Sequence, residues 1–130
     1  MDQLTRTIDR PLVQVELAIR QALADQGFGI LTEIDVAQVL ATKLGVERAP
    51  LKILGACNPA LVNVALERDP DVALALPCNV VLRALSDTTT TVSIADPAVI
   101  LPGADVAELA ADARSRLSAA LASLAPSPDE

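Results

Sequence analysis

The sequence predicts an α/β protein of the α+β kind, with a single open sheet of about five strands and helices packed on it. Short apolar and β-branched runs alternate with stretches whose apolar residues recur every three or four positions. Gly, Pro, Asp and Asn separate these runs, as turn residues and helix ends do. The predicted order is β-α-β-α-β-α-β-β-α, in a mixed or antiparallel sheet. We expect one compact domain over residues 1–124 and a disordered, Pro- and acid-rich tail over 125–130.

The first two elements are an edge strand over residues 4–8 and a helix that begins after it. Asp9 and Pro11 suit a helix start, because Asp accepts free amide hydrogen bonds and Pro fits the first turn. Gly27 ends the helix. Its apolar face consists of Leu12, Val15, Ile19, Ala22 and Leu23.

The second strand covers residues 28–34, and a short helix follows it. Strand alternation places Phe28, Ile30, Thr32 and Ile34 on one face, and Leu31 and Glu33 on the other. Asp35 is predicted to cap the helix, with Gln38 completing a capping box, and Gly45 ends it. The apolar residues of this helix are Val36, Val39, Leu40 and Leu44.

A third strand over residues 51–56 leads into a third helix. Asn58 and Pro59 start this helix as its cap and its first helical residue, and it stops before Asp69. The remaining elements are a connector over 71–77, a strand over 78–85, a turn over 86–89, a strand over 90–95, a loop over 97–103 and a helix over about 104–124.

The composition argues against several classes of partner. The formal net charge is −7 and Phe28 is the single aromatic residue. Nucleic-acid binders need Lys and Arg to displace counterions and often aromatic side chains for stacking, so we expect no nucleic-acid partner. The same charge disfavours anionic membrane surfaces, and no apolar run reaches the roughly 20 residues of a spanning helix. The first residues lack the apolar core of a signal peptide, which favours a cytoplasmic location.

The chain contains no histidine, which excludes Ser-His-Asp and Cys-His catalysis and imidazole metal sites within it. It contains two cysteines, Cys57 and Cys78, and each is followed by an asparagine. In a cytoplasmic chain such cysteines are expected to be free thiols or ligands rather than a structural disulfide. The two Cys-Asn dipeptides are therefore the candidate site.

Cys57 lies where the third strand ends and the third helix begins. Amide groups and the positive end of the helix dipole stabilise an anion at such a position, which predicts a lowered thiol pKa and a reactive thiolate. The alternative is a small buried residue that packs in a crowded turn beside Gly55 and Ala56.

Cys78 strengthens the case for a site only if it lies near Cys57. A parallel crossover would start the fourth strand at the opposite end of the sheet, on the order of 20 Å away. The connector over residues 71–77 is long enough to run back along the third helix, which would make the two strands antiparallel. The repeated Cys-Asn dipeptide favours this arrangement, in which the two corners converge.

Converging corners allow three kinds of chemistry. In the first, the thiols form a pair that cycles with a disulfide or carries a sulfane sulfur. In the second, they bind a metal ion completed by Glu33, Asp35 or Asp96, although the missing histidines and the lack of a Cys-x-x-Cys motif weaken this interpretation. The third is recognition of a small polar or anionic molecule by Asn58, Asn79 and backbone amides.

Most of these polar candidates also have a structural explanation. Local structure explains Asp35 and Asn58 as helix caps, Glu33 as the partner of Lys52 or Arg83 in a cross-strand ion pair, and Asp96 as a turn residue before Pro97. Asn79 differs, because it lies inside a predicted strand. If it is buried, its amide needs hydrogen-bond partners from the protein or from a ligand.

Four segments of the chain, taken in order, form a specific pattern. They are Gly27-Phe28-Gly29-Ile30-Leu31-Thr32-Glu33-Ile34-Asp35-Val36, Leu54-Gly55-Ala56-Cys57-Asn58-Pro59, Leu76-Pro77-Cys78-Asn79-Val80 and Ala95-Asp96-Pro97. Together they resemble the domain-of-unknown-function family 302, from the first helix to the last. The resemblance implies a compact α/β fold with a sheet, and a homodimer. It implies no established activity.

Two functions follow as hypotheses. In the first, Cys57 and the nearby Cys78 form a thiol-based site for a ligand, a metal ion, or sulfur and redox chemistry. In the second, the chain is a non-catalytic homodimeric ligand-binding or interaction module whose cysteines only pack. The expected partners are a second copy of the chain and a small polar or sulfur-containing ligand. An exposed apolar sheet face would favour dimerisation under either hypothesis.

Overall fold

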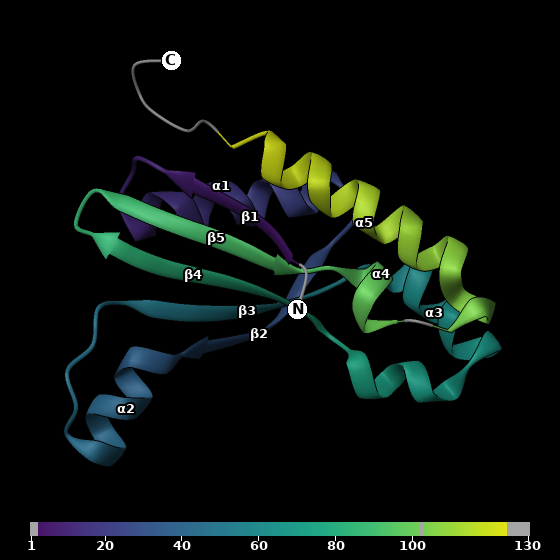
Figure 1. The fold of residues 1–130 in the computed structure, drawn as a ribbon, viewed down its shortest axis with the longest axis horizontal. Coiled ribbons are helices and arrows are strands. Elements are labelled where there is room, and N and C mark those ends of the chain that lie inside the picture. Colours follow the sequence, from purple (N-terminus) through teal and green to yellow (C-terminus); the bar gives the residue numbers. More distant parts are fainter. Residues whose placement is uncertain (1–2, 102, 125–130) are drawn as a thin grey trace.

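The computed structural model describes residues 3–101 and 103–124. Its strands are β1 (Gln3–Ile8), β2 (Gly29–Asp35), β3 (Leu51–Cys57), β4 (Cys78–Ser86) and β5 (Thr89–Ala95). They form one five-stranded sheet in the order β1-β5-β4-β3-β2, and every neighbouring pair is antiparallel (Figure 1). The predicted order of elements and the single open sheet are confirmed, and the sheet is antiparallel rather than mixed. The predicted tail over 125–130 lies outside the described residues.

The structure contains more short helices than the sequence pattern predicts. The helices are α1 (Leu12–Asp25), α2 (Val36–Leu44), α3 (Pro59–Arg68), α4 (Pro97–Ile100) and α5 (Ala107–Ala122), with two 3₁₀ helices, η1 (Pro70–Ala75) and η2 (Ala104–Val106). η1 fills most of the predicted connector, and α4 begins the predicted loop. At the start of η1 and of α4, the side chain of an aspartate, Asp69 or Asp96, accepts a hydrogen bond from a backbone amide. A proline follows each aspartate, and the two residues together begin a helical turn without a long apolar pattern. None of the described helices is both long and apolar enough to cross a membrane.

The caps of α2 and α3 are as predicted, and that of α1 is not. In each cap a side-chain oxygen accepts a hydrogen bond from a backbone amide: Asp35 from Gln38 at 3.0 Å, and Asn58 from Leu61 at 3.2 Å. The side chain of Gln38 donates to Thr42, so the second bond of the capping box does not form. Before α1 the N-cap position is Pro11 and no side chain bonds there, so the prediction that Asp9 caps this helix is wrong.

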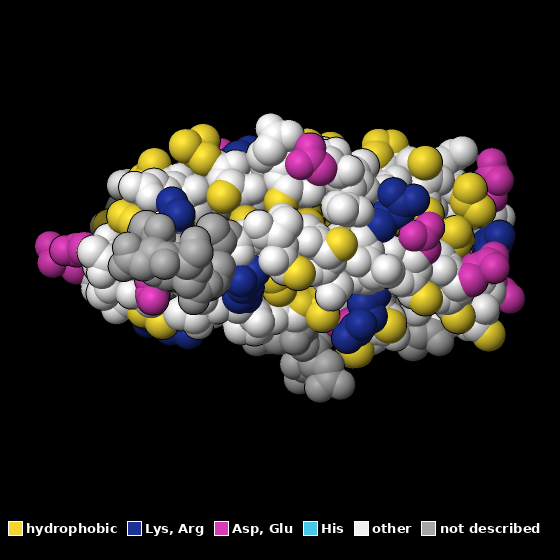
Figure 2. Space-filling view, turned by 90° about the horizontal axis from the view of Figure 1, so that it is seen from above, with side chains coloured by type: hydrophobic (Ala, Val, Ile, Leu, Met, Phe, Trp, Pro, Cys, Tyr) yellow, Lys and Arg dark blue, Asp and Glu magenta, His cyan; other side chains and the backbone are white. Residues whose placement is uncertain are grey.

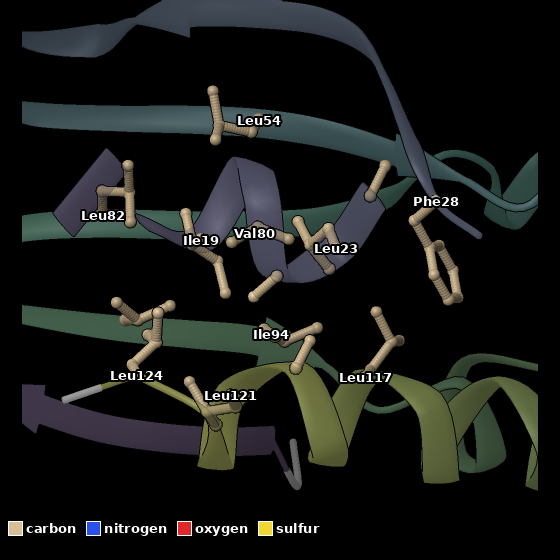
Figure 3. Packing of buried hydrophobic residues seen from close by; sticks show 14 of the residues in the cluster. Ile19, Leu23, Phe28, Leu54, Val80, Leu82, Ile94, Leu117, Leu121 and Leu124 are labelled. Atoms are coloured by element: carbon tan, nitrogen blue, oxygen red, sulfur yellow. The ribbon is translucent and has the colours of Figure 1, made fainter. Parts of the chain in front are cut away.

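α1 and α5 cover one face of the sheet and bury an aliphatic core against it (Figure 1). In the close-up of Figure 3, Ile19 and Leu23 of α1 and Leu117 of α5 lie against side chains of the central strands. The largest fully buried side chains include Ile8, Ile19, Leu23, Leu54, Leu82, Ile94 and Leu117. With a single aromatic residue in the chain, aliphatic packing provides nearly all of the hydrophobic stabilisation.

The other face of the sheet, here called the open face, points away from α1 and α5. Register and alternation assign to it Thr32 and Ile34 of β2, Leu51, Ile53, Gly55 and Cys57 of β3, Asn79, Val81 and Arg83 of β4, Thr91, Ser93 and Ala95 of β5, and Thr5 and Thr7 of β1. Arg83 is the only charged residue in this set. By contrast, the edge of the molecule that carries α5 shows both Lys or Arg and Asp or Glu side chains (Figure 2).

A β-bulge in β2 changes the predicted faces of this strand. The register with β3 shifts between Ile30 and Thr32, so that Leu31 is an extra residue. As a result Thr32 and Ile34 lie on the open face, whereas Ile30 and Glu33 lie on the helix-covered face. The prediction that Ile30 shares a face with Thr32 and Ile34 is therefore wrong.

Candidate functional site

The antiparallel pairing of β3 with β4 brings both Cys-Asn dipeptides to the same end of the sheet. Ala56 lies directly opposite Cys78 in the register, so Cys57 is one residue away from that pair. η1 makes this arrangement possible, because it brings the chain back beside α3 before β4 begins (Figure 1). The predicted convergence of the two corners is confirmed.

The two thiols nevertheless belong to different faces of the sheet. Successive side chains of a strand point to opposite faces, so Cys78 lies on the helix-covered face and Cys57 follows Gly55 onto the open face. The surroundings of Gly55 agree with this assignment, because a Cβ built there would contact Thr32 and lie 2.7 Å from Cγ of Pro77. Both cysteines are free, and a disulfide between them would require the strands to rearrange.

Cys78 borders a small apolar cavity beneath the helices. The volume of this cavity is about 30 Å³, room for roughly two water molecules. Apart from Cys57, Asn58 and Cys78, its wall is made of Ala, Val, Leu, Phe and Pro side chains. A wall of this kind offers water and polar ligands few hydrogen-bond partners. The cavity is thus an apolar hollow beside the cysteines.

Burial raises the pKa of both thiols. The pKa of Cys57 lies above its ordinary value because the thiol is partly removed from water. The pKa of Cys78 is raised to about 11, first by burial and second by the neighbouring Cys57. The expectation of a lowered thiol pKa at Cys57 is wrong, because partial removal of the thiol from water disfavours the thiolate. At neutral pH both thiols are therefore protonated and weakly nucleophilic.

The two asparagines lie in different surroundings. Asn58 is 7% exposed and caps α3. Its Nδ2 would lie 3.1 Å from a Cβ built on Gly27, whose positive φ of 86° already favours glycine. Asn79 is exposed on the open face opposite Gly55, where water can bond its amide. The two amides therefore do not face a common ligand.

Glu33 belongs to an ion-pair cluster on the helix-covered side of the sheet. Lys52 pairs with both Glu33 and Glu16, at 2.9 Å from Glu16. Arg20 pairs with the same two carboxylates, at 3.0 Å from Glu16 and 3.1 Å from Glu33. The hydrogen bond and the charge of Lys52 hold the pKa of Glu33 below its usual value. The predicted partner Lys52 is confirmed, whereas Arg83 lies on the open face.

The other two candidate carboxylates, Asp35 and Asp96, cap the helices α2 and α4. Asp35 lies beside the start of β3, about 17 Å along that strand from Cys57 at its end. Asp96 is 6% exposed, caps α4 and accepts a hydrogen bond from Nε of Arg114 at 2.9 Å. Among the residues that the structure describes, no three His, Cys, Asp or Glu side chains gather closely enough to hold a metal ion. A metal site at the cysteines therefore lacks further protein ligands in this part of the chain.

Sequence reasoning missed the residues that hold these groups in place. Glu16 and Arg20 stand four residues apart on α1, and this spacing was the available signal for their ion pair. Arg114 lies on α5, 18 residues after Asp96, and no local pattern links the two. The need for glycine at position 55 arises from Thr32 on β2 and from Pro77 just before β4, which a single segment does not reveal.

An antiparallel five-stranded sheet with helices on one face defines a mixed α/β domain of the α+β kind. The family model described as "Domain of unknown function DUF302" matches residues 4–124, and the chain therefore belongs to this family. The crystal structure of an uncharacterized conserved protein DUF302 from Bacillus stearothermophilus is similar, with a TM-score of 0.84 and 27% sequence identity. The similarity covers 94% of this chain and 97% of that chain. No curated protein matches the chain.

Proposed function

We propose that this chain is a non-catalytic interaction module that works as a homodimer, with cysteines that serve packing. The observation that carries the proposal is the open face of the sheet, which is nearly free of charge. A sheet that meets water on one face normally alternates apolar residues inward with polar and charged residues outward. The open face departs from that pattern, which favours a protein partner over water.

The open face combines an apolar strip with hydroxyl groups that are already paired. Ile34, Ile53 and Val81 lie side by side on β2, β3 and β4. On β1 and β5 the hydroxyl pairs are Thr5–Ser93 (3.2 Å) and Thr7–Thr91 (3.3 Å). Removal of water from apolar groups, and from hydroxyl groups that are already hydrogen-bonded, costs little free energy. The centres of protein interfaces are likewise poor in charge.

α2 supports the same conclusion, because it has the composition of a packed helix but no buried residue. Its apolar residues include Val39 and Leu44, which are 42% and 69% exposed, and Lys43 is its only charged residue. The helix follows the edge strand β2 and projects from the body of the molecule (Figure 1). A helix this apolar is normally buried against another surface.

A second copy of the chain is the occupant that fits these surfaces. The open face of five strands is about 19 Å wide and about 20 Å long, or roughly 400 Å² in projection. A stable interface needs about 800 Å² from each partner, so α2, about 13 Å long, has to contribute as well. Two copies present the same acid-free surfaces to each other, whereas a highly charged partner would find only Arg83 to pair with.

Sedimentation velocity of the full chain tests this proposal. The wild type is expected to sediment as a dimer at micromolar concentration. Val81→Glu is expected to sediment as a monomer, because its carboxylate would be buried at the interface without a partner. Val13→Glu is the matched control, since Val13 is 70% exposed on α1, and it should stay dimeric. A monomeric wild type, or equal dissociation of both folded variants, would contradict the proposal.

A thiol-based site is the second candidate function, favoured by the observation that both cysteines border one cavity at one end of the sheet. In this case Cys57 or Cys78 binds a sulfur-containing ligand or a metal ion, or carries a persulfide. This function would require a compartment that keeps thiols reduced, such as the cytoplasm. Mass spectra of protein purified without reductant test it. A bound metal, or an adduct of about 32 Da that Cys57→Ser or Cys78→Ser abolishes, would support it. Two unmodified thiols that alkylate slowly in the folded protein would leave only the dimer proposal.

A further inference from the structure

A larger cavity lies between the start of α1 and the end of the helix α5. Its volume is about 190 Å³, compared with about 30 Å³ for the cavity beside Cys78. Ile8 lines it and pairs with Thr90, so the cavity lies at the opposite end of the sheet from the Cys-Asn corners. The lining residues are Ile8, Arg10, Gln14, Val15, Ala18 and Leu124. Two of these side chains are polar and the others are aliphatic.

Arg10 gives this cavity its chemical character. Its side-chain Nε is buried and has no hydrogen-bond partner in the described part of the chain. Its backbone is held in place, because its amide donates to Ile8 at 2.9 Å and its carbonyl accepts from Oγ1 of Thr90 at 3.0 Å. No carboxylate of the described residues forms an ion pair with it. A buried donor without an acceptor is costly and rare, so the site is built for an acceptor that the described residues do not supply.

The surroundings of Arg10 add positive potential and apolar surface. α1 starts directly after it, with no side-chain cap and no acidic residue in its first turn. The start of a helix favours an anion, and the side-chain amide of Gln14, a residue of the cavity wall, offers a further donor. The aliphatic members of the wall favour an apolar group next to that anion. Both requirements are met by one small amphipathic molecule.

We propose that this cavity binds a small aliphatic carboxylate. The two carboxylate oxygens match the planar guanidinium of Arg10, and the hydrocarbon chain packs against Val15, Ala18 and Leu124. Inorganic phosphate would satisfy the guanidinium but leave the aliphatic wall without a partner. The site is separate from the proposed dimer interface, because Ile8 lies on the helix-covered face of the sheet.

Titration of the full chain with butyrate, followed by amide chemical shifts in ¹⁵N-labelled protein, tests this proposal. Butyrate is expected to cause saturable shifts at Val15, Ala18 and Leu124. Butyramide has the same shape without the charge, and it should bind at least about tenfold more weakly because a charge-assisted hydrogen bond is lost. Phosphate should also bind more weakly than butyrate. Equal binding of butyramide, or no saturable shift with butyrate, would overturn the proposal.

Two arginine variants test the role assigned to Arg10. Arg10→Gln should weaken butyrate binding at least about tenfold. Arg48→Gln removes the same charge from an exposed loop position and should bind butyrate like the wild type. Equal affinity in Arg10→Gln and Arg48→Gln would refute the assignment. If Arg10→Gln does not fold, the comparison of butyrate with butyramide on the wild type decides the question.

Discussion

Replacement of Gly55 by alanine is expected to destabilise the end of the sheet that carries both cysteines. Gly55 is buried in β3, between β2 and β4. A Cβ at this position would overlap Oγ1 of Thr32 and would lie 2.7 Å from Cγ and 3.3 Å from Cβ of Pro77. The first and second contacts are closer than van der Waals packing allows, so Thr32 and Pro77 would have to move.

The expected loss is about 1–3 kcal/mol of unfolding free energy, the range measured when a methyl group is forced into a packed site. For a domain of this length, each kcal/mol corresponds to roughly 4 °C in Tm. Thr32 lies on the exposed edge strand and can rotate its hydroxyl away, whereas the ring of Pro77 has no such freedom. Thr32→Ala in the Gly55→Ala background should therefore recover only part of the loss.

Urea unfolding followed by circular dichroism measures this loss, because the chain has no Trp or Tyr for fluorescence. Gly29→Ala is the matched control, since a Cβ on Gly29 meets no atom within 4 Å and its φ is not positive. That variant should be neutral or gain up to about 1 kcal/mol, through a less flexible unfolded chain. The reasoning is refuted if Gly55→Ala is as stable as the wild type, or if Gly29→Ala loses as much.

Three further predictions concern the charged and thiol groups. Because the pKa of Cys78 is raised to about 11, the folded state keeps a proton that the unfolded state releases near pH 9, so the unfolding free energy should fall between about pH 9 and pH 11 by up to about 3 kcal/mol. Urea unfolding across that pH range should show a smaller fall in the unfolding free energy for Cys78→Ala than for the wild type. The same fall in both proteins would contradict the assignment of this pH dependence to Cys78. Lys52→Met removes the main cause of the lowered pKa of Glu33, so NMR titration of that carboxyl should show its pKa rising toward the usual value. The exposed Lys43→Met is the control, and an unchanged Glu33 pKa in Lys52→Met would refute this cause. Alkylation of the folded protein should modify the half-buried Cys57 before the buried Cys78, as peptide masses would show, and the reverse order would contradict the assigned burial.

The order of strands and long helices was predictable because their signals are local. Asn58 and Pro59 start α3 through hydrogen bonds and backbone angles that involve only adjacent residues. The β-branched run in β5 reflects the preference of such side chains for a pleated strand. Elements shorter than two turns, such as α4, were missed because their apolar residues are too few to show a period.

The bulge in β2 is a feature that local sequence patterns did not predict. Alternation along the strand predicted one face for Ile30, Thr32 and Ile34, but a single extra residue moves the last two to the other face. The sequence shows no glycine or proline at the bulge that would mark it. The pairing with β3 determines its position, and that pairing joins residues more than twenty positions apart.

The sequence predicted where the candidate site lies in the fold, but not the protonation behaviour of its thiols. Two Cys-Asn dipeptides and a connector long enough to return along α3 predicted that Cys57 and Cys78 converge. A helix start predicted a lowered pKa at Cys57, whereas burial raises it. The cause is the partial removal of the thiol from water, which depends on groups packed around it in the folded chain.

The sequence by itself determined the properties that depend on residue type and on neighbours along the chain. These are the absence of histidine chemistry, the acidic charge, the aliphatic core and the caps of α2 and α3. Only the tertiary structure decided the faces on which Cys57 and Cys78 lie, the partner of Glu33 and the uncovered face of the sheet. The reason is physical: caps and propensities act over three or four residues, whereas burial and register depend on contacts between residues far apart in the chain.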